Sequence, residues 1–301
     1  MYSICAIIIT YNPDVDTIKR QYASLLGQVN QIVYVDNNSQ DISVLKAALE
    51  KFTTSSCKVH IIYNAENMGL GYAQNQGINQ AKKDKCTHVL ILDHDSILLE
   101  NFVCRLLEKE DKLLKAGQKV GAIGPVYYNE KTGEIYPITK YTGPFIKRII
   151  PENEPVEASF LISSGCLIRL DVVNDVGLMN EDLFIDYIDV EWSFRARNKG
   201  YKLYADPNSR MSHTIGDKRT SVFGRTISVH SPIRRYYLYR NSIFMIRCSY
   251  ISWGYKLREL TFNVLRFCVF MLLSSDRKTY FKYSLKGFRD GLKGKMGKYK
   301  D

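Results

Sequence analysis

Two carboxylates stand one residue apart at the end of an apolar run, in VLILDHDSILL (89–99). A hydrophobic core excludes unpaired charges, so Asp93 and Asp95 are expected where a strand leaves the core. There, one carboxylate can bind a divalent cation directly and the other can bind it through water. Mg²⁺ and Mn²⁺ combine a few carboxylates with substrate phosphates. The pair predicts a Mg²⁺ or Mn²⁺ site that neutralises a departing diphosphate, and the alternative is a solvated turn.

A second acidic cluster lies in LFIDYIDVEWSFRARNKGY (183–201). The sequence from residue 180 to 200 predicts a helix, and the i, i+3 spacing of Asp186 and Asp189 would put both on one helical face. A carboxylate within hydrogen-bond reach of an acceptor group can act as a general base. The alternative is that these acids stabilise the N-terminus of the helix.

Asp36 ends the stretch YVDNNS, and an acid at a strand tip can accept hydrogen bonds from a nucleotide base or ribose. The alternative is an Asx-turn that uses the local backbone. The sequence contains neither GxGxxG at this position nor GxxxxGK[ST] anywhere. A nicotinamide cofactor and a P-loop mechanism are therefore not expected.

The stretch NMGLGYAQNQGI (67–78) has three glycines along an expected helix, although glycine costs about 1 kcal/mol in a helix interior. This cost suggests that the backbone approaches a ligand or a neighbouring strand closely. Close packing of helix on sheet explains Gly77 equally well, and Asn75 is the better candidate for contact with a ligand.

His213 lies in ADPNSRMSHTIGD, a stretch typical of a loop. A loop histidine is less readily explained as a packed core residue. Its neutral imidazole could complete the coordination of a metal ion.

Short apolar runs alternate with helical patterns through the first half of the chain. The expected strands are 4–9, 32–35, 59–63 and 89–92, and the expected helices are 14–26, 43–52 and 71–81. This rhythm predicts an α/β fold with a mainly parallel sheet and helices on both faces. Polar residues follow all four strands, at the edge where such sheets bind ligands. Four polar clusters at one edge predict a binding site.

The second half of the chain is less regular, with expected strands at 120–125 and 159–169. A soft boundary near residue 250 separates an α/β domain (1–250) from a helical tail (251–301). The apolar start, MYSICAIIITYNP, lacks a positive leading segment and is interpreted as a core strand rather than a signal peptide.

The 301 residues are 45% hydrophobic and carry a net charge of +11, which indicates a globular chain with an anionic partner. Seven scattered cysteines without a CxxC pair argue against a disulfide framework and indicate a reducing compartment. A nucleic-acid binder would account for the charge, but its basic residues should line one folded surface.

Much of the positive charge lies in residues 277–300, with nine Lys or Arg and a single acid. Apolar residues recur there at helical spacing: Phe281, Leu285, Phe288, Leu292 and Met296. This pattern predicts a basic amphipathic helix that lies on an anionic membrane, or one that packs on the domain with a solvated basic face. The apolar stretch 262–273 is too short to span a bilayer, which needs about 20 residues.

Several motifs occur in a characteristic order: TYN, VDNNS, NxGxxxAxNxG and LDHDS, then SSGCLIR, FIDYIDVEWSFRARNKGY, SHTIGD and RRYYLYRN. Over roughly residues 4–245 the chain resembles the inverting glycosyltransferases of family 2, which have the GT-A fold. The later motifs are most similar to the bacterial rhamnosyltransferase branch. His94 departs from that branch, where glutamine is frequent.

The resemblance implies a role for each matching position. The implied contacts with the nucleotide sugar are Thr10, Tyr11, Asn12, Asp36, Asn67, Asn75, Asp93 and Gly165, and the implied metal ligands are Asp93, Asp95 and His213. Asp189 matches the catalytic base. Many members have Glu where this chain has Ile188, so Asp186 could share or take the base role.

The implied activity is transfer of a sugar, rhamnose from dTDP-rhamnose, to a lipid-linked or growing glycan in bacterial surface polysaccharide synthesis. Such an enzyme would work in the cytoplasm, peripherally at the inner face of the plasma membrane, and would bind no nucleic acid. A UDP-hexose donor is the alternative.

Overall fold

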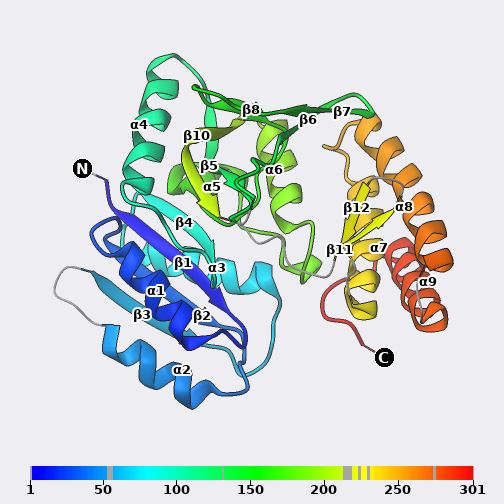
Figure 1. The fold of residues 1–301 in the computed structure, drawn as a ribbon, viewed down its shortest axis with the longest axis horizontal. Coiled ribbons are helices and arrows are strands. Elements are labelled where there is room, and N and C mark those ends of the chain that lie inside the picture. The colour runs from blue at the N-terminus through cyan, green and yellow to red at the C-terminus, as the bar shows by residue number, and fades with distance from the viewer. Residues whose placement is uncertain are drawn as a thin grey trace.

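A twisted eight-stranded sheet forms the centre of the computed structural model (Figure 1), which describes residues 2–52, 57–130, 132–212, 219–222, 225–228, 231–273 and 276–300. The strand order is β3-β2-β1-β4-β9-β5-β10-β8. These strands are β1 (Ile4–Thr10), β2 (Gln31–Asp36), β3 (Lys58–Tyr63), β4 (His88–Asp93), β5 (Val120–Tyr128), β8 (Val156–Ala158), β9 (Cys166–Arg169) and β10 (Lys202–Ser212). Two hairpins accompany it: β6 (Ile138–Thr142) with β7 (Phe145–Ile149), and β11 (Arg219–Val222) with β12 (Arg225–Ser228).

Most neighbouring strands of the sheet are parallel, as predicted, while β9 and β8 run antiparallel to their neighbours. The register aligns Thr10 with Asp36 and Ile9 with Asp93. The ends of β1, β2 and β4 therefore meet at one edge of the sheet, and their polar residues lie together there.

Helices cover both faces of the sheet, which confirms the predicted layering (Figure 1). They are α1 (Val15–Leu25), α2 (Ile42–Leu49), α3 (Leu70–Lys83), α4 (Phe102–Lys115), α5 (Leu170–Val176), α6 (Ile188–Asn198), α7 (Pro232–Arg247), α8 (Trp253–Leu273) and α9 (Arg277–Lys293), with 3₁₀ turns at Glu50–Phe52 and Glu181–Leu183. One core lies beneath α1, α2 and α4, and the other lies beneath α3, α5 and α6. The sheet thus has two apolar faces, as its continuously buried strands require.

The helices form where the sequence supplies an apolar stripe and a suitable start. In α1, Asp14 accepts a hydrogen bond from the Thr17 amide and caps the helix, while Ile18, Tyr22 and Leu25 turn toward the core. In α3, a Cβ on Gly77 would lie 2.3 Å from the Ile7 side chain. Close packing of helix on sheet, one of the two explanations considered for this glycine, is therefore the role it has here.

Helices α7, α8 and α9 form a separate layer beside the sheet (Figure 1), and α9 packs along α7. A small apolar cluster joins this layer to α6 through Phe194, Met245 and Tyr255. In the part of the chain that the structure describes, no helix is both long enough and apolar enough to cross a membrane.

Two elements differ from the sequence predictions. The expected strand 159–169 pairs only as β9, because residues 159–165 turn away from the sheet and Gly165 has a positive φ of 77°. The helix expected from residue 180 begins only at Ile188. Asp186 precedes it with a φ of 62°, so Asp186 and Asp189 do not share a helical face, and that prediction was wrong.

Candidate active site

The loops after β1 and β2 are held together by a buried polar cluster. Thr10 Oγ1 donates to Asp36 Oδ1 at 2.8 Å, and Ser39 donates to the same carboxylate through its amide at 2.8 Å and its hydroxyl at 2.5 Å. Thr10 and Asp36 have no exposed surface. The structure therefore shows the Asx-turn alternative for Asp36, and its carboxylate shapes the loop. Direct contact with a nucleotide base stays a prediction.

Ser39 also organises the loop after β1, although the sequence analysis did not single it out. Its hydroxyl accepts from the Asn12 amide at 2.8 Å, and Asn12 Oδ1 accepts from the Gln40 amide at 2.7 Å. Asn12 has a φ of 48°, which asparagine tolerates. Next to it, the Tyr11 side chain is 48% exposed and lies at the surface of the rim.

The loop after β3 joins this edge through two asparagines. Asn37 Nδ2 donates to Asn67 Oδ1 at 3.0 Å, and Asn67 Oδ1 also accepts from the Gly69 amide at 3.0 Å. The Met68 amide donates to Asn37 Oδ1. Asn67 therefore lies beside the β2 loop, at the edge where the sequence predicted it.

The turn that carries Asp93 and Asp95 is fixed from both sides. Gln21 of α1 donates to the carbonyls of Asp93 at 2.6 Å and Ser96 at 2.8 Å. Ser164 Oγ accepts from the Asp93 amide at 3.2 Å and bonds Ser96 Oγ at 2.6 Å. Gln21, Ser96 and Ser164 are buried. These bonds therefore fix the backbone of the turn that carries the two carboxylates.

The donor set at this turn suits a hard divalent cation. Asp93 ends β4 partly buried, and Asp95 is exposed two residues further on. Within the described residues, no three His, Cys, Asp or Glu side chains are placed together to hold a metal. His213, the third implied ligand, lies outside the described residues. Two carboxylates at the polar edge of the sheet would fit a cation whose remaining ligands are diphosphate oxygens and water.

Asp189 is the second residue of α6 and is partly buried beside this turn. The pKa of its carboxyl is raised to about 6, chiefly by burial and to a smaller extent by the negative charges of Asp186 and Asp93. The amides of Val190 and Ser163 oppose the rise by bonding the charged form. Asp189 accepts from the Ser163 amide, and the neighbouring Ser164 accepts from the Asp93 amide, so Asp189 lies close to the Asp93 turn. A pKa near 6 suits a general base at neutral pH.

The segment 182–189, here named the catalytic segment, has an unusual backbone. Phe184, Asp186 and Tyr187 have positive φ values between 62° and 65°, a region that non-glycine residues rarely adopt. Such conformations persist only where surrounding structure enforces them, and they cluster at functional sites. Arg234 of α7 binds Asp186 through its Nε at 3.2 Å and its Nη2 at 3.0 Å.

Two buried residues of α7 clamp this segment. Asn241 Nδ2 donates to the carbonyls of Leu183, Ile185 and Asp186 at 2.7–3.0 Å. Arg240 Nη2 donates to the carbonyls of Asp182 and Leu183 at 3.1 and 2.8 Å. Both side chains have no exposed surface. The sequence analysis quoted their motif, RRYYLYRN, but assigned these residues no role.

Two predicted contacts with the nucleotide sugar have other partners in this structure. Asn75 Nδ2 donates to the Met179 carbonyl and Glu181, and Asn75 Oδ1 accepts from the Met179 amide. Its amide is therefore engaged in anchoring the chain before the catalytic segment, which does not support direct contact with a ligand. At Gly165, a Cβ would lie 2.8 Å from Pro125 and Met211, so the glycine serves close packing within the protein.

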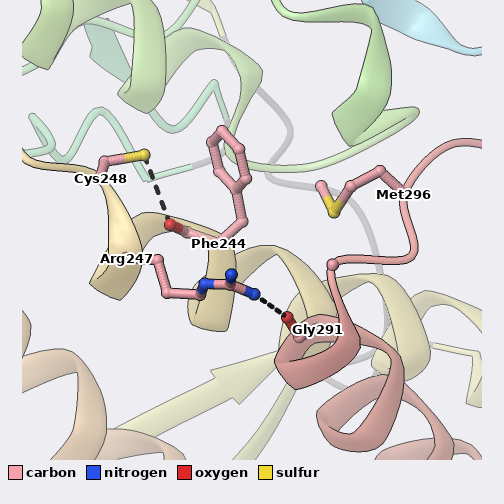
Figure 2. Close-up of a pocket in the computed structure, with 6 residues that line it drawn as sticks. Phe244, Arg247, Cys248, Gly291 and Met296 are labelled. Carbon is pink, nitrogen blue, oxygen red and sulfur yellow. Dashed lines mark hydrogen bonds between the residues drawn. The ribbon is translucent and has the colours of Figure 1, made fainter.

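A pocket of about 360 Å³ lies elsewhere, between the ends of α7 and α9 (Figure 2). Figure 2 shows Phe244, Cys248 and Met296 around it, and Arg247 donating to the Gly291 carbonyl at 3.2 Å. None of its lining residues belongs to the polar edge of the sheet or to the catalytic segment. The candidate active site is instead the open edge between the Asp93 turn and Asp189.

Comparisons with known proteins agree with this arrangement. A family model described as glycosyl transferase family 2 matches residues 5–177. The dTDP-rhamnosyl transferase RfbF of Shigella flexneri is 31% identical over 298 residues, which cover 98% of this chain and 97% of that relative.

Solved structures with the same architecture include three glycosyltransferases. GalNAc-T7 with UDP, GalNAc and Mn²⁺ superimposes with a TM-score of 0.60 at 16% identity, over 97% of this chain and 56% of that one. The mannosyltransferase PcManGT of Pyrobaculum calidifontis, with GDP-Man and Mn²⁺, gives 0.58 at 12% identity over 98% and 89%. S. aureus TarS 1–349 with UDP-GlcNAc gives 0.58 at 15% identity over 96% and 81%. The chain thus spans about half of GalNAc-T7, and the likeness confirms the predicted GT-A fold.

Proposed function

The chain belongs to glycosyl transferase family 2, and on that premise we propose that it transfers rhamnose from dTDP-rhamnose to a hydroxyl group of a glycan. The similarity to RfbF supports this donor because it extends over nearly the whole of both chains. It includes the catalytic segment and the clamp of α7, which lie outside the region matched by the family model.

We further propose that the acceptor is a lipid-linked or growing glycan of a bacterial surface polysaccharide. The enzyme would then work in the cytoplasm at the inner face of the plasma membrane. A UDP-hexose is the alternative donor, since the structural neighbour TarS was solved with UDP-GlcNAc.

The position of Asp189 near the Asp93 turn supports the proposed mechanism. Asp189 takes the proton of the acceptor hydroxyl, whose oxygen attacks the anomeric carbon from the side opposite the diphosphate. The C–O bond to the diphosphate breaks with inversion, and dTDP leaves. Arg234 holds Asp186 beside the base, and Asp186 could share its proton. Most of the acceleration would come from positioning and from stabilisation of charge.

The rim loops are proposed to hold the donor. Tyr11 is exposed for stacking on the base, while Thr10, Asn12, Asp36 and Asn67 fix the loop backbones around it. Asp93 and Asp95, with His213, would hold Mg²⁺ or Mn²⁺, which when bound supplies positive charge to the departing diphosphate.

A donor screen tests this proposal. The full chain is incubated with dTDP-rhamnose, UDP-glucose or UDP-galactose, with and without a bacterial glycolipid extract, and release of nucleotide is measured. We expect release of dTDP that the extract stimulates, that EDTA stops and that excess Mg²⁺ or Mn²⁺ restores. Turnover of a UDP-hexose alone would establish the alternative donor, and activity unaffected by EDTA would contradict the metal site.

A further inference from the structure

Helix α8 turns polar groups toward the protein and large apolar groups away from it. Its buried residues include Glu259 and Asn263. Its exposed large apolar residues lie on one side of the helix and are Trp253, Leu257, Leu260, Val264, Leu265 and Leu272. Trp253 is 82% exposed and Leu272 is 70% exposed. A helix that only completed a soluble domain would carry the opposite pattern.

Helix α9 has the same reversed pattern. It packs on α7 through small residues: a Cβ on Gly287 would lie 2.4 Å from the Tyr236 carbonyl, and one on Gly291 would lie 2.8 Å from Ile243. Its exposed large apolar residues follow i, i+4, i+7, i+11 spacing and are Phe281, Leu285, Phe288 and Leu292. These residues and the exposed stripe of α8 are here named the α8–α9 face.

The inward polar groups are hydrogen-bonded, so the orientation of both helices is fixed. Glu259 accepts from the Tyr187 hydroxyl and binds Arg266 at 3.1 Å. Asn263 Nδ2 donates to Ser242 Oγ at 2.8 Å. In α9, Asp290 accepts from the Tyr236 hydroxyl at 3.1 Å. Rotating α8 to bury its leucines would break its bonds to Tyr187 and Ser242, and rotating α9 would break its bond to Tyr236, so the α8–α9 face belongs to the stable fold.

The apolar stripe of α9 is bordered by positive charge. The exposed basic residues on the adjoining side are Lys278, Lys282, Arg289 and Lys293. Asp290, the only acid in residues 277–300, is buried. The outward side of α9 therefore presents cations beside large apolar groups.

The start of α8 continues this surface onto the β6–β7 hairpin (Figure 1). Gly254 lies so close to Gly143 that an added Cβ would be 2.2 Å from its carbonyl carbon. The hairpin next to this contact exposes Phe145 and the basic residues Lys147 and Arg148. Aromatic residues beside cations are typical of surfaces at the boundary of a membrane.

We propose that the α8–α9 face docks on a bilayer containing anionic lipids, with its leucines among the acyl chains and its lysines and arginines at the head groups. The positive charge of the face favours an anionic bilayer over a second copy of the chain. A symmetric dimer through this face would bring two basic rows together, whereas an anionic bilayer neutralises them. The proposal deepens the proposed function, since it places the enzyme where a lipid-linked acceptor lies.

Vesicle flotation of the full chain tests this proposal without any measurement of sugar transfer. Phosphatidylcholine vesicles with and without phosphatidylglycerol are compared at low and high salt. We expect binding to the anionic vesicles that weakens at high salt. Leu257→Ser with Leu285→Ser should weaken it by about tenfold or more, since both apolar groups are lost from the buried face. Lys282→Glu with Arg289→Glu should abolish the dependence on phosphatidylglycerol.

Matched controls come from α2, where Val44 is also exposed, and from the 3₁₀ turn after it, where Lys51 is exposed. Val44→Ser and Lys51→Glu should leave vesicle binding unchanged, and unchanged thermal melts of all variants would show that they fold. Equal binding by the leucine variant and the wild type would overturn the proposal. A dimer in sedimentation analysis that Leu285→Ser dissociates, without vesicle binding, would assign the face to a second copy. Binding of an oligonucleotide in place of vesicles would likewise overturn it.

Discussion

Two regions border the candidate active site and are held in place in different ways. The proposed donor rim comprises residues 10–12, 36–39 and 93–96, and the catalytic segment comprises residues 182–189. The rim is built at the ends of neighbouring parallel strands, and its loops are held by bonds to each other, to Gln21 of α1 and to Ser164 before β9. The catalytic segment has three strained residues, and the side chain of Asn241 that holds them lies 55 to 58 positions further along the chain. The rim is therefore held by the sheet and the segments next to it, whereas the catalytic segment depends on α7 and the helices packed on it.

This difference predicts separate effects on catalysis. Changes in the rim should act on binding of the donor or on the departing diphosphate. Changes in the clamp should act on the position of Asp189 and therefore on the rate of transfer.

The largest effect is expected at the Asp93–Asp95 end of the rim, where we propose that the metal binds. Asp95→Ala should reduce sugar transfer about a thousandfold, because stabilisation of the leaving group by a metal is worth several kcal/mol. Asp95 is exposed, so the melting temperature should not change. Transfer is measured at saturating dTDP-rhamnose. Asp16→Ala removes another exposed acid and should leave the rate unchanged; a full rate in Asp95→Ala would remove this residue from the site.

The clamp gives the next largest effect. Asn241→Ala leaves one buried and two partly buried carbonyls without this donor, which should cost about 1–3 kcal/mol of folding stability. It should also reduce kcat by about 100-fold through displacement of Asp189, with little change in KM for the donor. Thermal melts and steady-state kinetics measure the two effects.

Asn263→Ala is the matched control for this variant. It removes a buried hydrogen bond from α8 to Ser242, the neighbour of Asn241 in α7, but no hydrogen bond to the catalytic segment. It should lower the melting temperature without lowering kcat. A parallel loss of kcat in both variants would mean that stability alone explains the effect of Asn241.

The pH dependence follows from Asp189. Because burial raises the pKa of its carboxyl to about 6, kcat/KM should rise with pH and level off above about pH 7, with close to a tenfold change per pH unit below the midpoint. The same shift lowers stability as pH rises, since the folded state binds the proton more tightly than the unfolded chain. This loss of stability should occur between about pH 4, the pKa of the carboxyl in the unfolded chain, and its pKa of about 6 in the folded chain. A flat rate profile between pH 5 and pH 8 would contradict the assignment of the base.

The smallest effect is expected from the local part of the rim. Ser39→Ala removes the hydroxyl that bonds Asp36 and Asn12, at a cost of about 1 kcal/mol. KM for the donor should increase roughly fivefold, with kcat unchanged. Steady-state titration with dTDP-rhamnose measures this. A decrease in kcat with unchanged KM would contradict the claim that the rim acts on donor binding and the clamp acts on the rate of transfer.

The sequence predicted the rim well because its signals are local. Apolar runs that end in Thr10, Asp36 and Asp93 indicated both the strands and their shared edge, and the structure confirmed the α/β layers. It could not predict that Asp36 would be fully enclosed, since this depends on where the Ser39 hydroxyl turns.

The catalytic segment was predicted less accurately. Continuous helix from residue 180 was the simplest interpretation of its pattern, but packing against α7 overrides helix propensity there. Asn241 and Arg240 replace the hydrogen bonds that a helix would have made with carbonyls of residues 182–186. Contacts over such sequence separations have no periodic signal, so the roles of these two residues emerged only from the structure.

The most direct test of the account is the transfer rate of Asp189→Asn, with Asp16→Asn as the control. The account predicts a loss of about 10²- to 10⁴-fold, as expected for removal of a general base, with donor binding retained. The melting temperature at neutral pH should not fall, because the variant removes a charge whose burial is unfavourable. A correctly folded Asp189→Asn variant that transfers sugar at the wild-type rate would contradict it.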